Sequence, residues 1–221
     1  MKKIICISDT HSLHNLISSE YFNIKDKKNS ILIHAGDVSN RGRIEEIDDF
    51  CKWYDGLDFP HKIFCAGNHD WGFQLYPIQI KKILKKYPTI IYLQDDYVVI
   101  DGIKIYGTPW QPEFYNWAFN LKRGKELQEK WKYIDNDINI LVSHSPPFGI
   151  LDYVERDMIH VGCEDLKNRI SELKSLKINI FGHIHQGYGQ IEEAGVKFVN
   201  ASICTERYIP TNKPIIIEYD N

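Results

Sequence analysis

Metal-binding side chains follow five separate apolar segments of this 221-residue chain. In two places the donors stand two positions apart, as in Asp9 and His11 and in His183 and His185. Residues two apart on an extended strand point to the same side, so each pair can face one site. The candidate donors are Asp9 and His11 after residues 3–8, Asp37 after 31–35, Asn68 and His69 after 62–66, His144 after 138–142, and His183 and His185 after 178–181.

Carboxylate, amide and imidazole donors together are typical of sites for divalent Mn, Fe, Co or Zn. The donors are too many for one ion, whereas two ions about 3.5–4 Å apart that share one carboxylate would use them all. Such a pair activates water and holds a phosphoryl group. Taken singly, Asp9 can cap a turn, Asp37 can be a turn residue and His144 can be a hydrogen-bonded core histidine. Five such coincidences at five strand ends are improbable together, so the pattern favours a metal site.

The elements that position these donors alternate between strand and helix in the first half of the chain. Apolar runs over 3–8, 31–35 and 62–66 predict buried parallel strands, because they show no polar alternation. Helical spacing of apolar residues predicts helices over 43–55 and 78–87, the second closed by Pro88. Ligands of such sheets bind beyond the carboxyl ends of the strands, where the donors stand.

The second half has more strands and fewer helices. Short strands over 90–93, 97–100 and 103–106, with turn signals at Asp95-Asp96 and Asp101-Gly102, predict a second sheet or an antiparallel extension. Helices are expected over 121–133 and 163–176, and core strands over 138–142 and 178–181. Three further strands, over 188–192, 197–200 and 215–219, would complete the second sheet.

An aromatic-rich loop over 107–119 lies between these elements. It is either a plug packed over the core or the wall of a ligand pocket, since aromatic side chains bury well in both settings. As a wall, it would offer Trp110, Phe114, Tyr115 and Trp117 for stacking on a nucleobase, a contact worth about 1–3 kcal/mol per base in nucleic-acid sites.

Size and composition predict one compact domain over residues 1–221, with 43% hydrophobic and 26% charged residues. No apolar run approaches the about 18 residues of a membrane span. Five scattered cysteines without a Cys-x-x-Cys pair predict reduced thiols in a cytoplasmic protein. The formal charge of −3 and the absence of a long basic run disfavour long nucleic acid as a partner. The oligomeric state is left open.

The order Asp9-x-His11, Gly36-Asp37, Gly67-Asn68-His69-Asp70, His144 and Gly182-His183-x-His185 resembles that of the calcineurin-like metallophosphoesterases. The resemblance implies an α/β fold, a four-layer αββα sandwich of two mixed β-sheets flanked by helices, with two metal ions at the strand ends. Segments 107–112 and 182–189, together with Ser145-Pro146-Pro147, are similar to the metallophosphoesterase-domain-containing branch, which is associated with cyclic-nucleotide hydrolysis. Some animal members of that branch lack the histidine that this chain has as His183.

The resemblance also implies roles for individual residues. Two divalent ions are expected, with Mn preferred to Fe, Co, Zn or Mg. The first would be held by Asp9, His11, Asp37 and His185. The second would be held by Asp37, Asn68, His144 and His183, with Asp37 bridging. His69 would protonate the leaving group and Asp70 would orient His69. Asn68, Arg41 and Trp110 are the predicted substrate-binding residues.

The sequence therefore predicts a phosphodiesterase that acts on cyclic nucleotides or similar small phosphodiesters. One alternative is a phosphomonoesterase or protein phosphatase, because Arg41 could bind a phosphate through two hydrogen bonds. Those enzymes place an arginine just before Gly-Asn-His, however, and Ala66 stands there. A nuclease is disfavoured by the missing basic surface. The other alternative is a catalytically inactive scaffold that binds a protein partner. The presence of every donor and of His69 disfavours this alternative.

Overall fold

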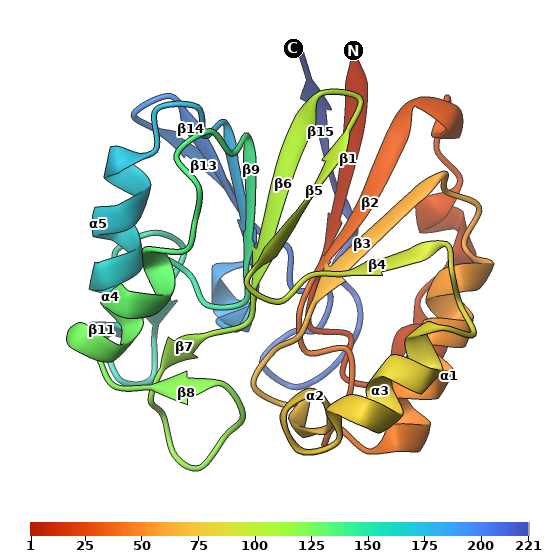
Figure 1. Cartoon of the computed structure of the whole chain (residues 1–221), viewed down its shortest axis with the longest axis horizontal. Helices are drawn as coiled ribbons and strands as arrows, with labels where there is room; N and C mark the ends of the chain where they lie inside the picture. Colours follow the sequence, from red (N-terminus) through yellow and green to blue (C-terminus); the bar gives the residue numbers. More distant parts are fainter. Residues whose placement is uncertain (221) are drawn as a thin grey trace.

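A computed structural model describes residues 1–220 and shows two β-sheets packed face to face (Figure 1). The first sheet has the order β15 (Ile215–Tyr219), β1 (Lys2–Ile7), β2 (Ser30–Ala35), β3 (His61–Cys65) and β4 (Ile90–Tyr92). The second has the order β13 (Gly189–Glu193), β14 (Val196–Asn200), β12 (Ile178–Phe181), β9 (Ile140–Ser143), β6 (Ile103–Thr108) and β5 (Asp96–Ile100). Both sheets are mixed, since β15, β13 and β5 run antiparallel to their neighbours and the other pairs are parallel.

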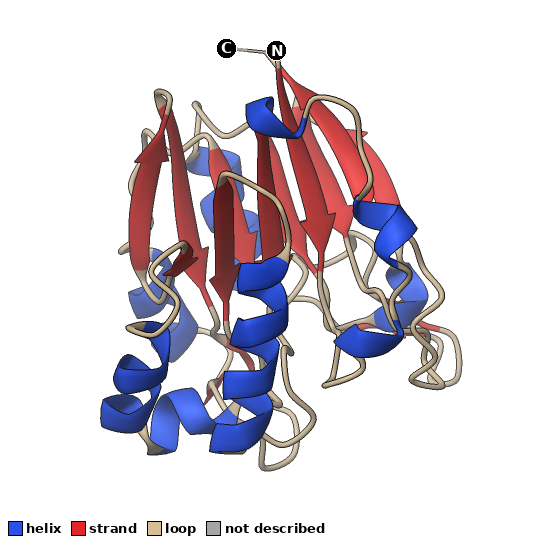
Figure 2. Cartoon of the chain, turned by 90° about the vertical axis from the view of Figure 1, so that its right-hand side faces the viewer, coloured by secondary structure: helices blue, strands red, loops and turns tan. Residues whose placement is uncertain are grey.

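Helices cover the outer face of each sheet (Figure 1 and Figure 2). The helices α1 (Ile44–Gly56), α2 (Trp71–Leu75) and α3 (Pro77–Leu84) pack on the first sheet, and α4 (Lys125–Trp131) and α5 (Glu164–Glu172) on the second. The space between the sheets is filled by aliphatic side chains such as Ile33 and Ile63 from one and Ile105, Val142 and Ile180 from the other. The predicted four-layer αββα sandwich is confirmed.

Short elements complete the chain. The small strand pairs are β7 (Gln111–Pro112) with β8 (Asn120–Leu121), and β10 (Tyr153–Val154) with β11 (Ile159–His160). The 3-10 helices are η1 (His14–Leu16), η2 (Ser19–Phe22), η3 (Lys27–Asn29) and η4 (His185–Gly187). None of the helices in residues 1–220 combines the length and apolar character needed to span a bilayer. All five cysteines are free and buried, as predicted.

Two predictions about sheet membership are wrong. The strand at 215–219 does not complete the second sheet but pairs antiparallel with β1 at the edge of the first. The strand at 90–92 joins the first sheet as well, parallel to β3, and only β5 and β6 form the predicted hairpin of the second sheet. Hydrophobic patterning sets which face of a strand is buried, whereas its partner is chosen by long-range packing. The predicted helix over 121–133 also begins later, at Lys125, because Asn120 and Leu121 form β8.

The arrangement brings five strand ends together. The strands β1, β2, β3, β9 and β12 are parallel members of the two central sheets, and the predicted donors follow their carboxyl ends. Four of the donors, Asp9, His11, Asp37 and His183, have positive φ angles of 44–66°. That conformation is costly for residues other than glycine and clusters at functional sites. It turns the chain sharply just past β1, β2 and β12.

Candidate metal centre

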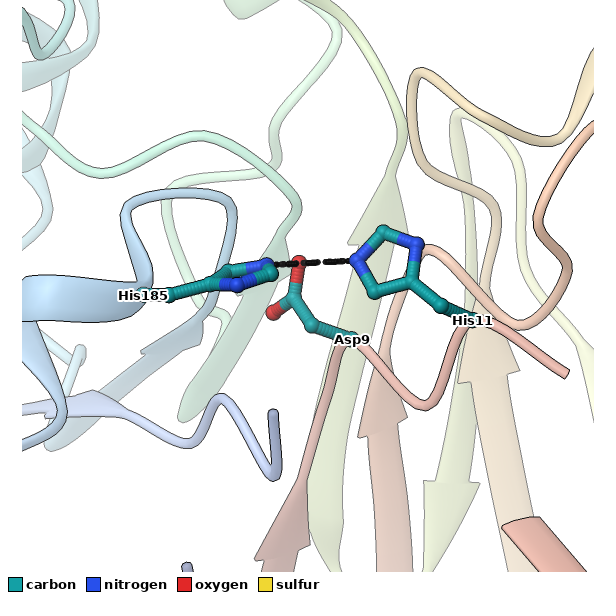
Figure 3. A group of neighbouring side chains, drawn as sticks. All are labelled: Asp9, His11 and His185. Carbon is teal, nitrogen blue, oxygen red and sulfur yellow. Dashed lines mark hydrogen bonds and ion pairs between the residues drawn. The ribbon is translucent and has the colours of Figure 1, made fainter. Parts of the chain in front are cut away.

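Asp9, His11 and His185 form the first group of donors (Figure 3). The Nε2 atoms of His11 and His185 are 3.2 Å apart. Oδ1 of Asp9 lies 3.3 Å from Nε2 of His185 and 3.8 Å from Nε2 of His11. Residues from opposite ends of the chain thus present one oxygen and two nitrogen atoms to a common point.

The second group contains Asp37, Asn68, His144 and His183. Oδ1 of Asn68 is 2.9 Å from Nε2 of His144 and 2.8 Å from Nδ1 of His183. Oδ2 of Asp37 is 3.4 Å from Nε2 of His144 and, on its other side, 3.7 Å from Nε2 of His11 in the first group. All seven predicted metal ligands are therefore brought together, and Asp37 lies where a bridging carboxylate would have to lie.

The hydrogen bonds made by Nδ1 of two histidines show which nitrogen of each ring carries the proton. Nδ1 of His144 is 2.9 Å from the carbonyl of Ala35, and Nδ1 of His185 is 2.9 Å from the carbonyl of Thr205. A carbonyl only accepts, so both Nδ1 atoms carry the proton and both Nε2 atoms of the neutral rings offer lone pairs. These lone pairs face other acceptors, the oxygen atoms of Asn68 and Asp9 among them. Such a convergence of acceptors requires positive charge, either a proton on each ring or a bound metal ion.

The charges of the centre lead to the same conclusion. Burial disfavours a charged His144, but the carboxylates of Asp37 and Asp9 outweigh burial and raise the pKa of His144 to about 9. Burial would raise the pKa of Asp37, yet the histidines around it hold that pKa well below its ordinary range. Two fully buried carboxylates thus demand positive charge beside them, which divalent ions would supply.

Two glycines of the motifs are required by close packing. A Cβ atom on Gly67 would lie 2.3 Å from Oδ1 of Asp37 and 2.6 Å from Cε1 of His144. A Cβ atom on Gly182 would lie 1.9 Å from Oδ2 of Asp9. The glycine before each donor segment lets that segment approach a carboxylate of another strand, which explains the Gly-Asn-His and Gly-His-x-His patterns.

His34 lies beneath the centre and connects two of its loops. The amide of Gly36 donates to Nδ1 of His34 (3.2 Å), so the proton of the neutral ring is on Nε2, which lies 3.0 Å from Oγ1 of Thr10. Burial lowers the pKa of His34 to about 3. The ring is therefore neutral and joins the segment after β1 to the segment after β2.

His69 lies beside the two groups of donors, but Asp70 does not orient it. Nδ1 of His69 donates to the carbonyl of Asn40 (2.8 Å), which leaves Nε2 for the site. The carboxylate of Asp70 instead accepts hydrogen bonds from the amides of Gly67, Val38 and Ser39 (2.8, 3.1 and 2.9 Å). The predicted Asp70–His69 contact is wrong because this buried carboxylate is fully used in joining the loop after β2 to the loop after β3.

A cavity of about 580 Å³, here called the metal cavity, opens onto the donors. Of the three predicted substrate-binding residues, Asn68 lines it, whereas Arg41 lines a neighbouring cavity and Trp110 lines neither. The indole of Trp110 donates to Oδ2 of Asp95 (2.7 Å) beneath the ammonium group of Lys130. Trp110 is held by these structural contacts.

Two aromatic residues that are not among the three predicted substrate-binding residues stand near His69 and His11. Trp117 stacks on the ring of His69 at 4.2 Å between centroids, and Tyr208 lies 4.8 Å from the ring of His11. The loop over 107–119 is thus both a plug over the core and a pocket wall. Ala118 and Phe119 are buried, while Trp117 lines the metal cavity. Aromatic content pointed to Trp117. Tyr208 follows no motif, and only the fold places it here.

Comparison with known proteins now identifies this arrangement. Residues 2–187 match the family described as calcineurin-like phosphoesterase. The chain belongs to the calcineurin-like phosphoesterase family. It is 38% identical to human metallophosphoesterase domain-containing protein 1 over 236 aligned residues, which cover 98% of this chain and 70% of the human protein. It is 32% identical to UPF0046 protein T07D4.2 of Caenorhabditis elegans, covering 98% and 59% of the two chains.

Solved structures share the fold of this phosphoesterase at low sequence identity. One crystal structure covers 90% of both chains with a TM-score of 0.72 and 17% identity. TT1561 of Thermus thermophilus has a TM-score of 0.63 and 12% identity, covering 90% of this chain and 88% of its own. Membership in the family makes the protein a metal-dependent phosphoester hydrolase, and the family implies a dinuclear centre of divalent ions, for which the convergent side chains offer candidate ligands.

Proposed function

We propose that this phosphoesterase is a phosphodiesterase for cyclic nucleotides or similar small phosphodiesters. The observation that carries the proposal is the metal cavity, whose walls above the donors are formed by Phe114, Tyr115, Trp117 and Tyr208. Its volume is in the range of about 300–1,000 Å³ found for sites of small organic ligands, and is more than a phosphate group alone requires. Aromatic walls next to bound metal ions suit a phosphate that carries a nucleobase.

His69 is the group that we assign to the leaving oxygen. Its Nδ1 donates to the carbonyl of Asn40, and the ring stacks on Trp117. These two contacts fix the orientation of the ring and leave Nε2 without a hydrogen bond to the described residues. One ring nitrogen of His69 also lies within 4.8 Å of donor atoms of His11 and Asp37. A protonated Nε2 can therefore give its proton to an ester oxygen at the centre. Bound divalent ions would polarise the phosphoryl group and make water more acidic.

The test compares 2′,3′-cyclic AMP, 3′,5′-cyclic AMP and p-nitrophenyl phosphate after the protein has been stripped of metal and reloaded with Mn²⁺, the ion that we propose for the mixed donors. Cleavage of the cyclic diesters without the monoester supports the proposal. Cleavage of the monoester alone contradicts it and favours a phosphomonoesterase. No turnover with any divalent ion favours a scaffold for a protein partner.

The arginines near the site favour the diester over the monoester. The arginine that lines the metal cavity, Arg156, is engaged in an ion pair with Asp157 (3.1 Å). Arg41, the residue that could hold a monoester dianion, lines the neighbouring cavity and not the metal cavity. The position before Gly67 is Ala66, which offers no positive charge. We also propose a cytoplasmic location, supported by the five buried free cysteines, since reduced thiols are usual there.

A further inference from the structure

A second cavity lies on the other side of His69 from the metal ligands. Its volume is about 670 Å³, and its walls include Arg41, Arg43, Trp71 and Tyr76; we call it the arginine cavity. Among residues 1–220, the linings of the arginine cavity and the metal cavity have three residues in common: His69, Trp117 and Tyr208. The ring assigned to the leaving oxygen therefore stands at the junction of the two cavities.

The arginine cavity is positively charged. Two arginines line it and, within the described part of the chain, no aspartate or glutamate does. No ion pair among residues 1–220 involves the guanidinium of Arg41 or Arg43. The nearby carboxylate of Glu46 is used in another way, since it accepts hydrogen bonds from the backbone amides of Arg41 and Arg43 (3.1 and 2.9 Å). Both guanidinium groups are thus free to bind an anion.

The remaining walls are aromatic and apolar. Leu75 is 57% exposed, and Tyr76 and Tyr208 are each 45% exposed, although all three are large apolar residues. Trp71 and Trp117 are partly exposed in the same cavity. Aromatic walls with few polar groups are typical of sites for planar organic ligands.

The loop that carries the two arginines is fixed to the catalytic side of the molecule. Gly42 has a φ of 68°, and a Cβ atom there would lie 2.2 Å from the amide nitrogen of Trp71, so the loop packs directly on the start of α2. The amide of Gly42 donates to Oγ of Ser39 (2.9 Å). The carbonyl of Asn40, in the same loop, holds the ring of His69. The position of the arginines is therefore coupled to that of His69.

We propose that the arginine cavity receives the leaving group of the phosphodiester, and that this group is a planar ring bearing an anionic substituent. The inference rests on the proposed phosphodiesterase activity and narrows its substrate class from cyclic nucleotides, whose departing oxygen stays attached to the product, to small acyclic diesters with a negatively charged departing arm. During hydrolysis the water oxygen bonds to phosphorus and the bond from phosphorus to the departing oxygen breaks. That oxygen leaves as an alcohol with the proton of His69, which water restores.

Two synthetic diesters test the charge preference. Both are methyl aryl phosphates with a 4-nitrophenol leaving group; one carries a carboxylate at ring position 3 and the other the neutral carboxamide. Nitrophenolate release gives kcat/KM for each, and we expect the carboxylate to be favoured. In the Arg41→Gln/Arg43→Gln variant the ratio of the two values should fall about tenfold. The Arg41→Lys/Arg43→Lys variant keeps the charge and should recover much of the ratio.

The matched control is Arg156→Gln, because Arg156 lines the metal cavity and not the arginine cavity. Its ratio should equal that of the unchanged protein, whatever its absolute rates. A ratio that is the same in the unchanged protein and in the double glutamine variant overturns the proposal. So does a fall of the same size in Arg156→Gln, which would show only a general effect of charge.

A binding measurement separates this inference from the activity on which it rests. The chain has five tryptophans. In protein labelled with ¹⁵N at the indoles, 3-hydroxybenzoate should shift the signals of Trp71 and Trp117 and leave buried Trp131 unchanged, while 3-hydroxybenzamide should bind more weakly. If neither diester is hydrolysed but these shifts occur and vanish in the double glutamine variant, the phosphodiesterase proposal fails and the anion site stands. Absence of the shifts overturns the anion site.

Discussion

Replacing Asp37 with asparagine removes one negative charge from the point where the two groups of ligands meet. Oδ2 of Asp37 lies between Nε2 of His144 and Nε2 of His11, at 3.4 and 3.7 Å. Against the opposing effect of burial, Asp37, with help from Asp9, raises the pKa of His144 from 6.5 to about 9. That rise corresponds to about 3 kcal/mol for one positive charge. In the variant, a doubly charged ion would lose at least as much favourable interaction energy. We therefore expect Asp37→Asn to lower metal affinity about a hundredfold or more.

The assay is the metal content per chain after equilibration with Mn²⁺ at fixed concentration, together with the melting temperature. The variant can keep the backbone bond from His69 to Oδ1 of residue 37 (2.8 Å), so loss of metal need not mean loss of the loop. Asp152→Asn is the matched control, because Asp152 is equally buried and accepts hydrogen bonds from the amides of Gly149 and Gly162, but is not a candidate metal ligand. Full metal loading of Asp37→Asn would refute the bridging assignment.

Three further variants test other parts of the site. His69→Ala should keep both metal ions and slow turnover about 10²–10⁴-fold, most for poor leaving groups; loss of metal would make His69 a ligand instead. Gly182→Ala should lower metal content, since its Cβ atom would lie 1.9 Å from the carboxylate of Asp9, and unchanged content and activity would contradict the packing argument. The contribution of His34 to the stability of the metal-free protein should fall as pH drops below 6.5, because the unfolded chain binds a proton there that folded His34 does not bind until about pH 3. Between pH 7 and 5 the loss measured by urea unfolding should be about 2 kcal/mol smaller in His34→Gln, whereas equal losses would show that His34 titrates normally.

The ligands could be predicted from the sequence because each follows an apolar run whose strand character is evident. Parallel strands bring their carboxyl ends to one edge of a sheet, and the packing of the two sheets then brings Asp9, after β1, close to His183, after β12. The four layers were implied by the resemblance to the metallophosphoesterases, whereas the periodicities predicted only the strands and helices that form them. What periodicity does not encode is which strand pairs with which, and β4 and β15 were accordingly assigned to the wrong sheet.

The surroundings of the ligands were harder to predict for a different reason. The role of Asp70 depends on hydrogen bonds from three backbone amides. Every residue except proline has such an amide, so the sequence does not show which amides Asp70 binds. Tyr208 comes from a segment without motif or periodicity, and it reaches the site only because the chain passes there after β14. The helix α2 has five residues, too few to show a helical repeat.

The two carboxylates of the centre also hold the backbone that presents the other ligands. Asp9 accepts a hydrogen bond from the amide of His183 (3.1 Å), and Asp37 accepts one from the amide of His69 (2.8 Å). His183 has a φ of 66°, a conformation that costs about 1–3 kcal/mol for a residue other than glycine. The bond from Asp9 offsets part of that cost and joins the end of β1 to the end of β12. The same side chain is thus a candidate ligand and the acceptor that fixes a neighbouring backbone, so removal of either carboxylate side chain must disturb charge and geometry together. Asparagine removes the charge but keeps an acceptor, and therefore separates the two effects.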